Sequence, residues 1–186
     1  MLAVSLLAVT VGKAQDASNN GDNPLMFEAS YVSDNITNMV GGVKTGYGYL
    51  GMATIHVGFD VEKAGLWKGG YLFINAANTH GATPSADLLG DMQVASNIEA
   101  GNHTYLQELW FRQTIRNVEL TVGLQDLNVE FANSENGALF LNSSFGILPV
   151  ISGNIAAPIF PLTALGFTAK WNITENTTWL NALYDG

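Results

Sequence analysis

The sequence holds few residues in an arrangement suited to covalent chemistry. Its histidines, His56, His80 and His103, lie far apart along the chain, and no G-x-S-x-G motif places a nucleophilic serine on a turn. Asp126 and Glu130 could form a glycosidase carboxylate pair. Two separate roles suit them better, in which one carboxylate caps a loop and the other lines it. Cysteine is absent, which excludes a thiol nucleophile and a disulfide framework. We therefore expect a protein that is not an enzyme and uses no metal or cofactor.

A second set of polar residues suits the non-covalent handling of a solute. These residues recur at alternate positions within otherwise apolar segments, which is the pattern of strands with one wet and one apolar face. In residues 105–115, for example, Leu109 and Phe111 alternate with Glu108 and Arg112. The charged side chains expected to share the wet face are Glu28, Asp60, Glu108, Arg112, Glu119 and Lys170.

The elements that position these side chains are predicted to be seven antiparallel strands. From Pro24 onward the dominant period is two, and Gly, Asn, Asp and Pro bound the periodic segments. Phe73 and Trp179 fall on the otherwise polar side, whereas Trp171 and Tyr184 are expected near strand ends on the apolar side, as in an aromatic girdle. The predicted strands are residues 25–32, 50–60, 71–78, 105–115, 117–126, 163–172 and 178–184.

The lengths of the predicted connections distinguish the two ends of the sheet. The long connections are residues 33–49, 79–104 and 127–162, and the shorter ones between them are residues 61–70, 116 and 173–177. Short turns at one end and long loops at the other are typical of outer-membrane barrels. A secreted, water-soluble β-sandwich that binds glycans is the alternative, because it also alternates apolar and polar residues.

Composition sets the broad class. The 186 residues are 47% hydrophobic and only 12% charged, yet no stretch approaches the about 18 consecutive apolar residues of a spanning helix. The apolar residues must therefore lie in short strands that face either lipid or a protein core. The excess of 16 Asp and Glu over 7 Lys and Arg excludes nucleic-acid binding, which needs clustered basic side chains.

The chain divides into three predicted parts. Residues 1–14 carry an apolar run and a small-residue cleavage pattern, which predict a signal peptide, with a buried first strand or helix as the alternative. Residues 15–23 are expected to be a flexible lead segment, and residues 24–186 a portion of a β-barrel. Seven strands cannot close a barrel of even strand number, so the sequence is expected to be the amino-terminal portion of a longer barrel.

Several short motifs, in order, carry a family resemblance. They are residues 65–70, 90–93, 96–100, 108–111, 122–128, 130–132 and 139–147. With them, the chain resembles the amino-terminal part of a carbohydrate-selective porin of the OprB family. The resemblance implies a sixteen-stranded barrel in the bacterial outer membrane, passive diffusion of mono- or short oligosaccharides, and a narrowest point built by inward-folded loops. Its partners would be a carbohydrate solute and outer-membrane lipid, and a homo-oligomer is compatible with it.

Sugar passage requires a wet wall with hydrogen-bonding groups and an aromatic plane, which Trp110 would supply. Residues 127–162 are expected to fold into the channel, because Leu139, Phe140 and Phe145 are too apolar for a free loop and must pack against the inner wall or a neighbouring protomer. Alternatively, the charged side chains pair with one another and so hold the wall rigid. The expected pore-lining residues are Glu108, Trp110, Arg112, Glu119, Gln125, Asp126, Asn128, Glu130 and Lys170.

Overall fold

The computed structural model describes residues 12–13, 22–134, 136–155 and 157–185. Residues 1–11 and 14–21 lie outside this range, so the signal peptide and most of the lead segment remain predictions; residues 12 and 13 form a short strand. No helix within the described residues is long and apolar enough to cross a membrane.

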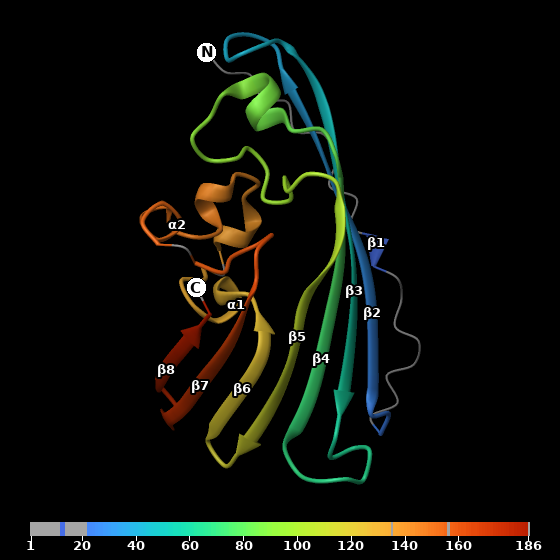
Figure 1. The fold of residues 1–186 in the computed structure, drawn as a ribbon, viewed down its shortest axis with the longest axis vertical. Helices are drawn as coiled ribbons and strands as arrows, with labels where there is room; N and C mark the ends of the chain where they lie inside the picture. Colours follow the sequence, from blue (N-terminus) through green and yellow to red (C-terminus); the bar gives the residue numbers. More distant parts are fainter. Residues whose placement is uncertain (1–11, 14–21, 135, 156, 186) are drawn as a thin grey trace.

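The described strands form a single antiparallel sheet in which each strand pairs with its neighbour in sequence (Figure 1). All seven predicted strands are confirmed, and an additional two-residue strand precedes them. The strands are β1 (Gly12–Lys13), β2 (Leu25–Asn38), β3 (Gly46–Asp60), β4 (Gly70–Gly81), β5 (His103–Ile115), β6 (Val118–Gln125), β7 (Ala164–Thr174) and β8 (Thr177–Tyr184).

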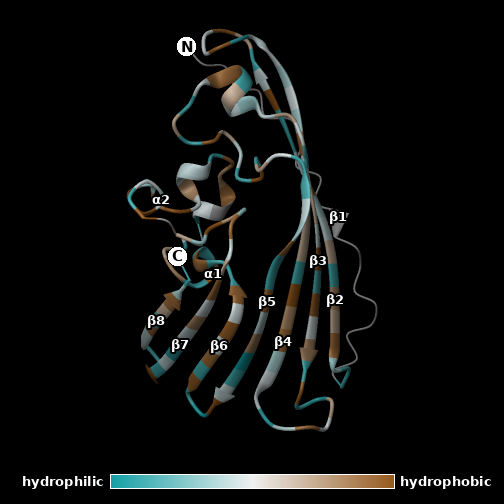
Figure 2. Cartoon of the chain, viewed as in Figure 1, coloured by the Kyte–Doolittle hydropathy of each residue, from teal (hydrophilic) through white to brown (hydrophobic). Residues whose placement is uncertain are grey.

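The pairing register gives the sheet one apolar and one polar face. Directly paired residues share a face, and Val57, Ile74, Leu109 and Leu124 follow one another across β3 to β6. Banding along the strands in Figure 2 reflects the alternation between the faces. We call the two sides the apolar face and the polar face. The residues of the apolar face include Phe27, Ile55, Val57, Leu72, Ile74, Leu109, Phe111, Val118, Leu120, Val122, Leu165, Phe167 and Trp171.

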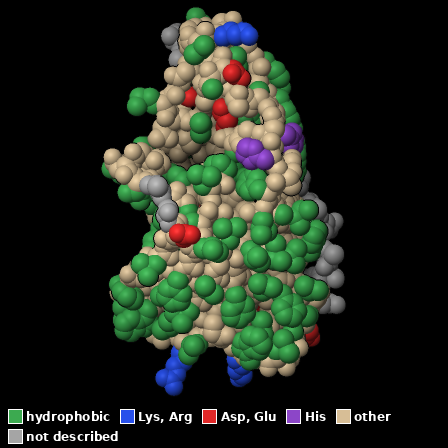
Figure 3. All heavy atoms as spheres, in the orientation of Figure 1, with side chains coloured by type: hydrophobic (Ala, Val, Ile, Leu, Met, Phe, Trp, Pro, Cys, Tyr) green, Lys and Arg blue, Asp and Glu red, His purple; other side chains and the backbone are tan. Residues whose placement is uncertain are grey.

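Hydrophobic side chains gather over the lower half of the face visible in Figure 3, with Lys and Arg at its lower edge. Val122 and Phe167 of the apolar face are 56% and 44% exposed. Because all described strands belong to one sheet, no second sheet covers these side chains within the described residues. A sandwich would bury them, so the structure does not support the alternative of a soluble β-sandwich.

The polar face collects the charges, as predicted. Glu28, His56, Asn75 and Glu108 are successive partners across β2 to β5. A second row joins Asp60, Tyr71, Arg112, Thr121 and Thr168 across β3 to β7, and Glu119 pairs with Lys170. All strand charges named in the sequence analysis therefore lie on the polar face.

The connection predicted for residues 33–49 is wrong. β2 runs on to Asn38 and β3 begins at Gly46, so that only residues 39–45 connect them. The missed strand segments contain Asn, Asp and Gly, which are depleted in strands. They continue the sheet because the antiparallel pairing of β2 with β3 runs without interruption to Asn38 and Gly46. The connections 82–102 and 126–163 at the same end are long, as predicted, and residues 116–117 and 175–176 form short turns at the other.

Two aromatic residues of β8 lie on the opposite faces to those predicted. Trp179 pairs with Trp171 and is on the apolar face, whereas Tyr184 pairs with Gly166 and is on the polar face. The aromatic pair near this strand end is therefore Trp171 with Trp179. The register shift between Asn172 and Thr174 changes the alternation at the β7–β8 turn, which periodicity within one strand does not reveal.

Placing a charge on the apolar face should destabilise the protein in lipid. We expect Val122→Arg to lower the free energy of unfolding by about 2–4 kcal/mol, the cost of a lipid-facing Arg near the bilayer midplane. Thr114→Arg is the control, because Thr114 pairs with Glu119 on the polar face. Denaturant unfolding of the protein, expressed from its complete reading frame and folded in lipid, measures both. Equal losses in the two variants would contradict the assignment of the faces.

Candidate functional site

A β-bulge turns consecutive polar side chains toward the polar face. Asn75 pairs with Glu108 but Ala76 pairs with Leu106, which leaves Gln107 as the extra residue of β5. Gln107 and Glu108 are only 4% and 7% exposed. The Asn75 Nδ2 donates to Glu108 Oε2 over 3.2 Å, and Gln107 Nε2 lies 3.5 Å from Oδ2 of Asp126. Bulges commonly re-aim side chains in this way.

Aromatic side chains cover the polar face beside Glu108. Trp110 stacks on its cross-strand partner Phe73, with ring centroids 4.9 Å apart, and Tyr71 lies 6.1 Å from the same indole. The Trp110 Nε1 donates to Glu108 Oε1 over 3.2 Å. The position of Phe73, which breaks the polar pattern of its strand, is explained by this stack.

Gly123, the partner of Trp110 on β6, gives the indole its space. Its φ is +138°, and a Cβ at this position would lie 2.3 Å from the Leu109 carbonyl oxygen and 3.0 Å from the Trp110 Cβ. Any larger side chain would collide with the backbone of β5. Gly123 therefore lets β6 lie close to β5 at Trp110.

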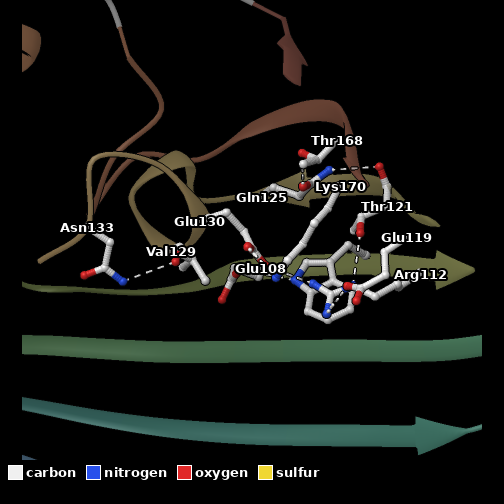
Figure 4. Close-up of polar contacts among 11 residues, drawn as sticks. Glu108, Arg112, Glu119, Thr121, Gln125, Val129, Glu130, Asn133, Thr168 and Lys170 are labelled. Atoms are coloured by element: carbon white, nitrogen blue, oxygen red, sulfur yellow. Dashed lines mark hydrogen bonds and ion pairs between the residues drawn. The ribbon is translucent and has the colours of Figure 1, made fainter. Parts of the chain in front are cut away.

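Ion pairs link the long loop, residues 126–163, to the polar face (Figure 4). Its first helix, α1 (Leu127–Glu130), presents Glu130, whose Oε1 lies 3.3 Å from Arg112 Nη2 and whose Oε2 lies 3.5 Å from Lys170 Nζ. Arg112 Nη1 also lies 3.5 Å from Glu119 Oε2. We call Arg112, Glu119, Glu130 and Lys170 the charge network. One loop carboxylate thus joins bases from β5 and β7.

The Arg112 side chain is held by further contacts. Its Nε donates to Thr121 Oγ1 over 3.1 Å, and its guanidinium carbon lies 4.8 Å from the Trp110 ring centroid. Such a cation–π contact adds to the ion pairs. The predicted residues Glu108, Trp110, Arg112, Glu119, Glu130 and Lys170 are therefore brought together in one continuous set of contacts.

The side chains of Gln125 and Asn128 form hydrogen bonds with nearby protein groups. Gln125 is 6% exposed; its Nε2 donates to the Gly166 carbonyl over 2.9 Å, and its Oε1 accepts from Thr168 Oγ1 over 2.8 Å. The Asn128 Nδ2 donates to the carbonyls of Phe131 and Ala132. Both side chains thus fix local structure, Gln125 between β6 and β7 and Asn128 within the long loop.

Asp126 joins the long loop to the end of β6. Its Oδ1 accepts from the Asn128 amide over 2.8 Å, which caps α1. Burial, together with the nearby Glu108 charge, raises the pKa of Asp126 to about 6, against the hydrogen bonds from the Asn128 and Phe160 amides and from Gln107. The carboxyl therefore titrates close to neutral pH.

The long loop and the β4–β5 connection are joined to each other and to the sheet. Amides of Asn97 and Ser143 donate to the carbonyls of Leu141 and Val94. Ser96, fully buried, donates to Asp34 Oδ2 of β2 over 2.6 Å. Short helices occur along these connections: η1 (Ser85–Leu89), η2 (Gly137–Leu139), η3 (Ser143–Phe145) and α2 (Pro149–Ser152).

A cavity of about 570 Å³ lies between the two connections, and Met52 of the polar face, Glu99 and Phe145 contribute to its lining. Phe145 stacks on Phe140, with ring centroids 4.4 Å apart, whereas Leu139 is 83% exposed. Phe140 and Phe145 are also about half exposed, so the packing of this apolar segment against the inner wall or a neighbouring protomer stays a prediction.

Sequence reasoning missed residues whose side chains complete the site. Asn75 and Gln107 depend on the bulge, which adjacent polar residues at 107 and 108 could have signalled. The Asp34–Ser96 contact joins residues distant in sequence and left no local signal. No group of three or more potential metal-ligating His, Asp or Glu side chains occurs in the described part of the chain.

Replacing Asp126 should remove a pH dependence of the local stability at the start of the long loop. Its folded-state pKa is raised above the usual 3.8, so its stabilising contribution is present at low pH and is lost as the pH rises through about 6. The loss is at most about 3 kcal/mol, since one pKa unit is worth about 1.4 kcal/mol. We expect wild-type amide protection at residues 127–131 to fall between pH 4 and 7. Asp126→Asn, which preserves the cap, should flatten this profile in hydrogen exchange, and an unchanged profile would contradict the assignment.

Removing the Glu130 carboxylate should loosen the long loop. Glu130→Ala breaks the pairs with Arg112 and Lys170, each half-buried, at a cost of about 1 kcal/mol. We expect faster proteolysis within residues 131–155 while the sheet stays folded. Glu175→Ala, which removes an exposed carboxylate from the short β7–β8 turn, is the control for the loss of one negative charge. Equal cleavage rates in both variants and wild type would show that the charge network does not hold the loop.

Comparisons with known proteins agree with this architecture. The family model described as carbohydrate-selective porin, OprB family, matches residues 44–186. A solved structure, "High pH structure of Pseudomonas putida OprB", aligns with a TM-score of 0.77 at 17% identity, over 87% of this chain and 40% of that chain. The chain thus spans less than half the length of that porin, with which it shares the fold. No curated protein sequence matches significantly. The matched residues make up most of the chain, and it belongs to the OprB family of carbohydrate-selective porins.

Proposed function

We propose that the protein forms part of a channel in the bacterial outer membrane through which sugars diffuse passively. The observation that carries the proposal is the separation of the two faces, with exposed aliphatic residues such as Val122 on one and the charge network on the other. OprB porins are outer-membrane proteins, and an apolar outer wall around a polar lumen is the usual design of such barrels. The apolar face contacts lipid and the polar face contacts solute.

The polar face supplies what a neutral sugar needs during passage. Sugar hydroxyls both donate and accept hydrogen bonds, and the wall offers the Glu108 and Glu119 carboxylates together with the Arg112 and Lys170 donors. Trp110, Phe73 and Tyr71 add aromatic surface for the apolar faces of a pyranose ring. Arg112, Glu119 and Lys170 are only partly exposed and are already paired, so that they favour passage over tight binding.

The long loop narrows the channel in this proposal. Glu130 attaches its first turn to the wall at Arg112 and Lys170, while the contact between Ser96 and Asp34 attaches the β4–β5 connection to β2. The charge network therefore both lines the channel and fixes the loop, which combines the two roles considered for it. Asp126 and Asn128 contribute by shaping the loop, and Gln125 by joining β6 to β7.

Sugar flux and its dependence on Trp110 test the proposal. Liposomes containing the protein from its complete reading frame should swell in isosmotic glucose. In single-channel recordings, Trp110→Ala should weaken the interruption of ion current by added sugar, since an aromatic contact is worth about 0.5–1.5 kcal/mol. That range corresponds to an about two- to tenfold rise in the half-blocking sugar concentration.

Trp179→Ala is the matched control, because it removes the same side chain from the apolar face. Its half-blocking concentration should equal that of the wild type. No swelling in any mono- or oligosaccharide would contradict the proposed function. Equal effects of the two tryptophan variants would contradict only the role of Trp110 and would leave the proposed channel in place.

A further inference from the structure

The polar face carries more negative than positive charge. Of the lysines and arginines whose side chains the structure describes, Arg112 and Lys170 alone lie in strands, and both are on this face. Lys44, Lys63 and Lys68 lie in connections. The carboxylates of the polar face, together with those that the long loop brings to it, are Glu28, Asp34, Asp60, Glu108, Glu119, Asp126 and Glu130.

Both bases of the polar face are already engaged with carboxylates. Arg112 lies within 3.5 Å of Glu119 and 3.3 Å of Glu130, and Lys170 within 3.5 Å of Glu130. A passing anion would therefore have to compete with two protein carboxylates for these bases. The positive charge of the wall is largely neutralised where it occurs.

Glu108, in contrast, has no basic partner among the described residues. Its oxygens accept hydrogen bonds from the neutral Asn75 amide and Trp110 indole. Next to it, the Asn75 Oδ1 and Gln107 Oε1 are buried and accept no hydrogen bond within the described structure. The Asp126 carboxyl lies nearby, where its Oδ2 accepts from Gln107 Nε2 over 3.5 Å. This part of the wall is rich in acceptors and poor in donors.

We propose that the channel favours cationic solutes, in particular sugars bearing an ammonium group, over sugars bearing a carboxylate or phosphate. The proposal rests on the proposed sugar channel and specifies its solute class. An ammonium group carries a positive charge, which the field of the uncompensated, buried Glu108 carboxylate attracts. Acidic side chains lining a pore favour cations in general, because a narrow, low-dielectric wall concentrates their field.

The ionic selectivity of the reconstituted channel tests this inference. In a planar bilayer under a KCl gradient, the permeability ratio of K⁺ to Cl⁻ should exceed one. Glu108→Gln should lower this ratio by about twofold or more, because it removes one of the fixed negative charges that attract cations into the channel. Glucosamine should likewise enter liposomes faster than glucuronate, and Glu108→Gln should reduce the difference.

Glu175→Gln is the matched control, because it removes the same charge from the short β7–β8 turn. It should leave both the permeability ratio and the glucose flux unchanged. Glucose flux with a ratio of one or below, or equal effects of the two substitutions, would overturn the inference while leaving the sugar channel in place. Absence of glucose flux would instead contradict the proposed channel, and with it the inference that rests on it.

Discussion

The hydrogen-bonding needs of a backbone in hydrocarbon govern this structure. Each peptide group that faces lipid must find its partner within the protein, because the solvent offers none. A meander of neighbouring antiparallel strands meets this need in the described residues, where every long strand pairs with the next one in sequence. Once the backbone is paired in this way, side chains alternate strictly between two environments. The separation of Val122 from Arg112 is a consequence of the pairing.

That constraint is also why much of the fold could be predicted from the sequence. A strand with one face in lipid and one in water must alternate, and the alternation in residues 105–126 located β5 and β6 and put Glu108, Arg112 and Glu119 on one face. The extensions of β2 and β3 escaped prediction because their polar residues lie where pairing, and not apolar burial, maintains the strand. The faces of Trp179 and Tyr184 were predicted wrongly, because a register shift at a turn is set by two strands together.

The site shows a similar division. The residue types and their alternation along the strands indicated the members of the charge network and the loop that carries Glu130. They could not indicate that a single carboxylate would contact both Arg112 and Lys170, since that depends on how α1 lies against the sheet. Nor could they separate the roles of Gln125 and Asn128, whose side chains are held by backbone groups, from those of freely placed lining residues.

The bulge at Gln107 determines how β5 would respond to a change of length. Deleting Gln107 would restore plain alternation and leave Leu106 on the apolar face and Tyr105 on the polar face, because Leu106 already pairs with Ala76 beyond the bulge. A single-codon deletion elsewhere in β5, with the bulge retained, would instead turn every side chain between the deletion and the β4–β5 connection to the other face. Natural length variation among such chains should accordingly concentrate in the loops and, within this strand, at the bulge.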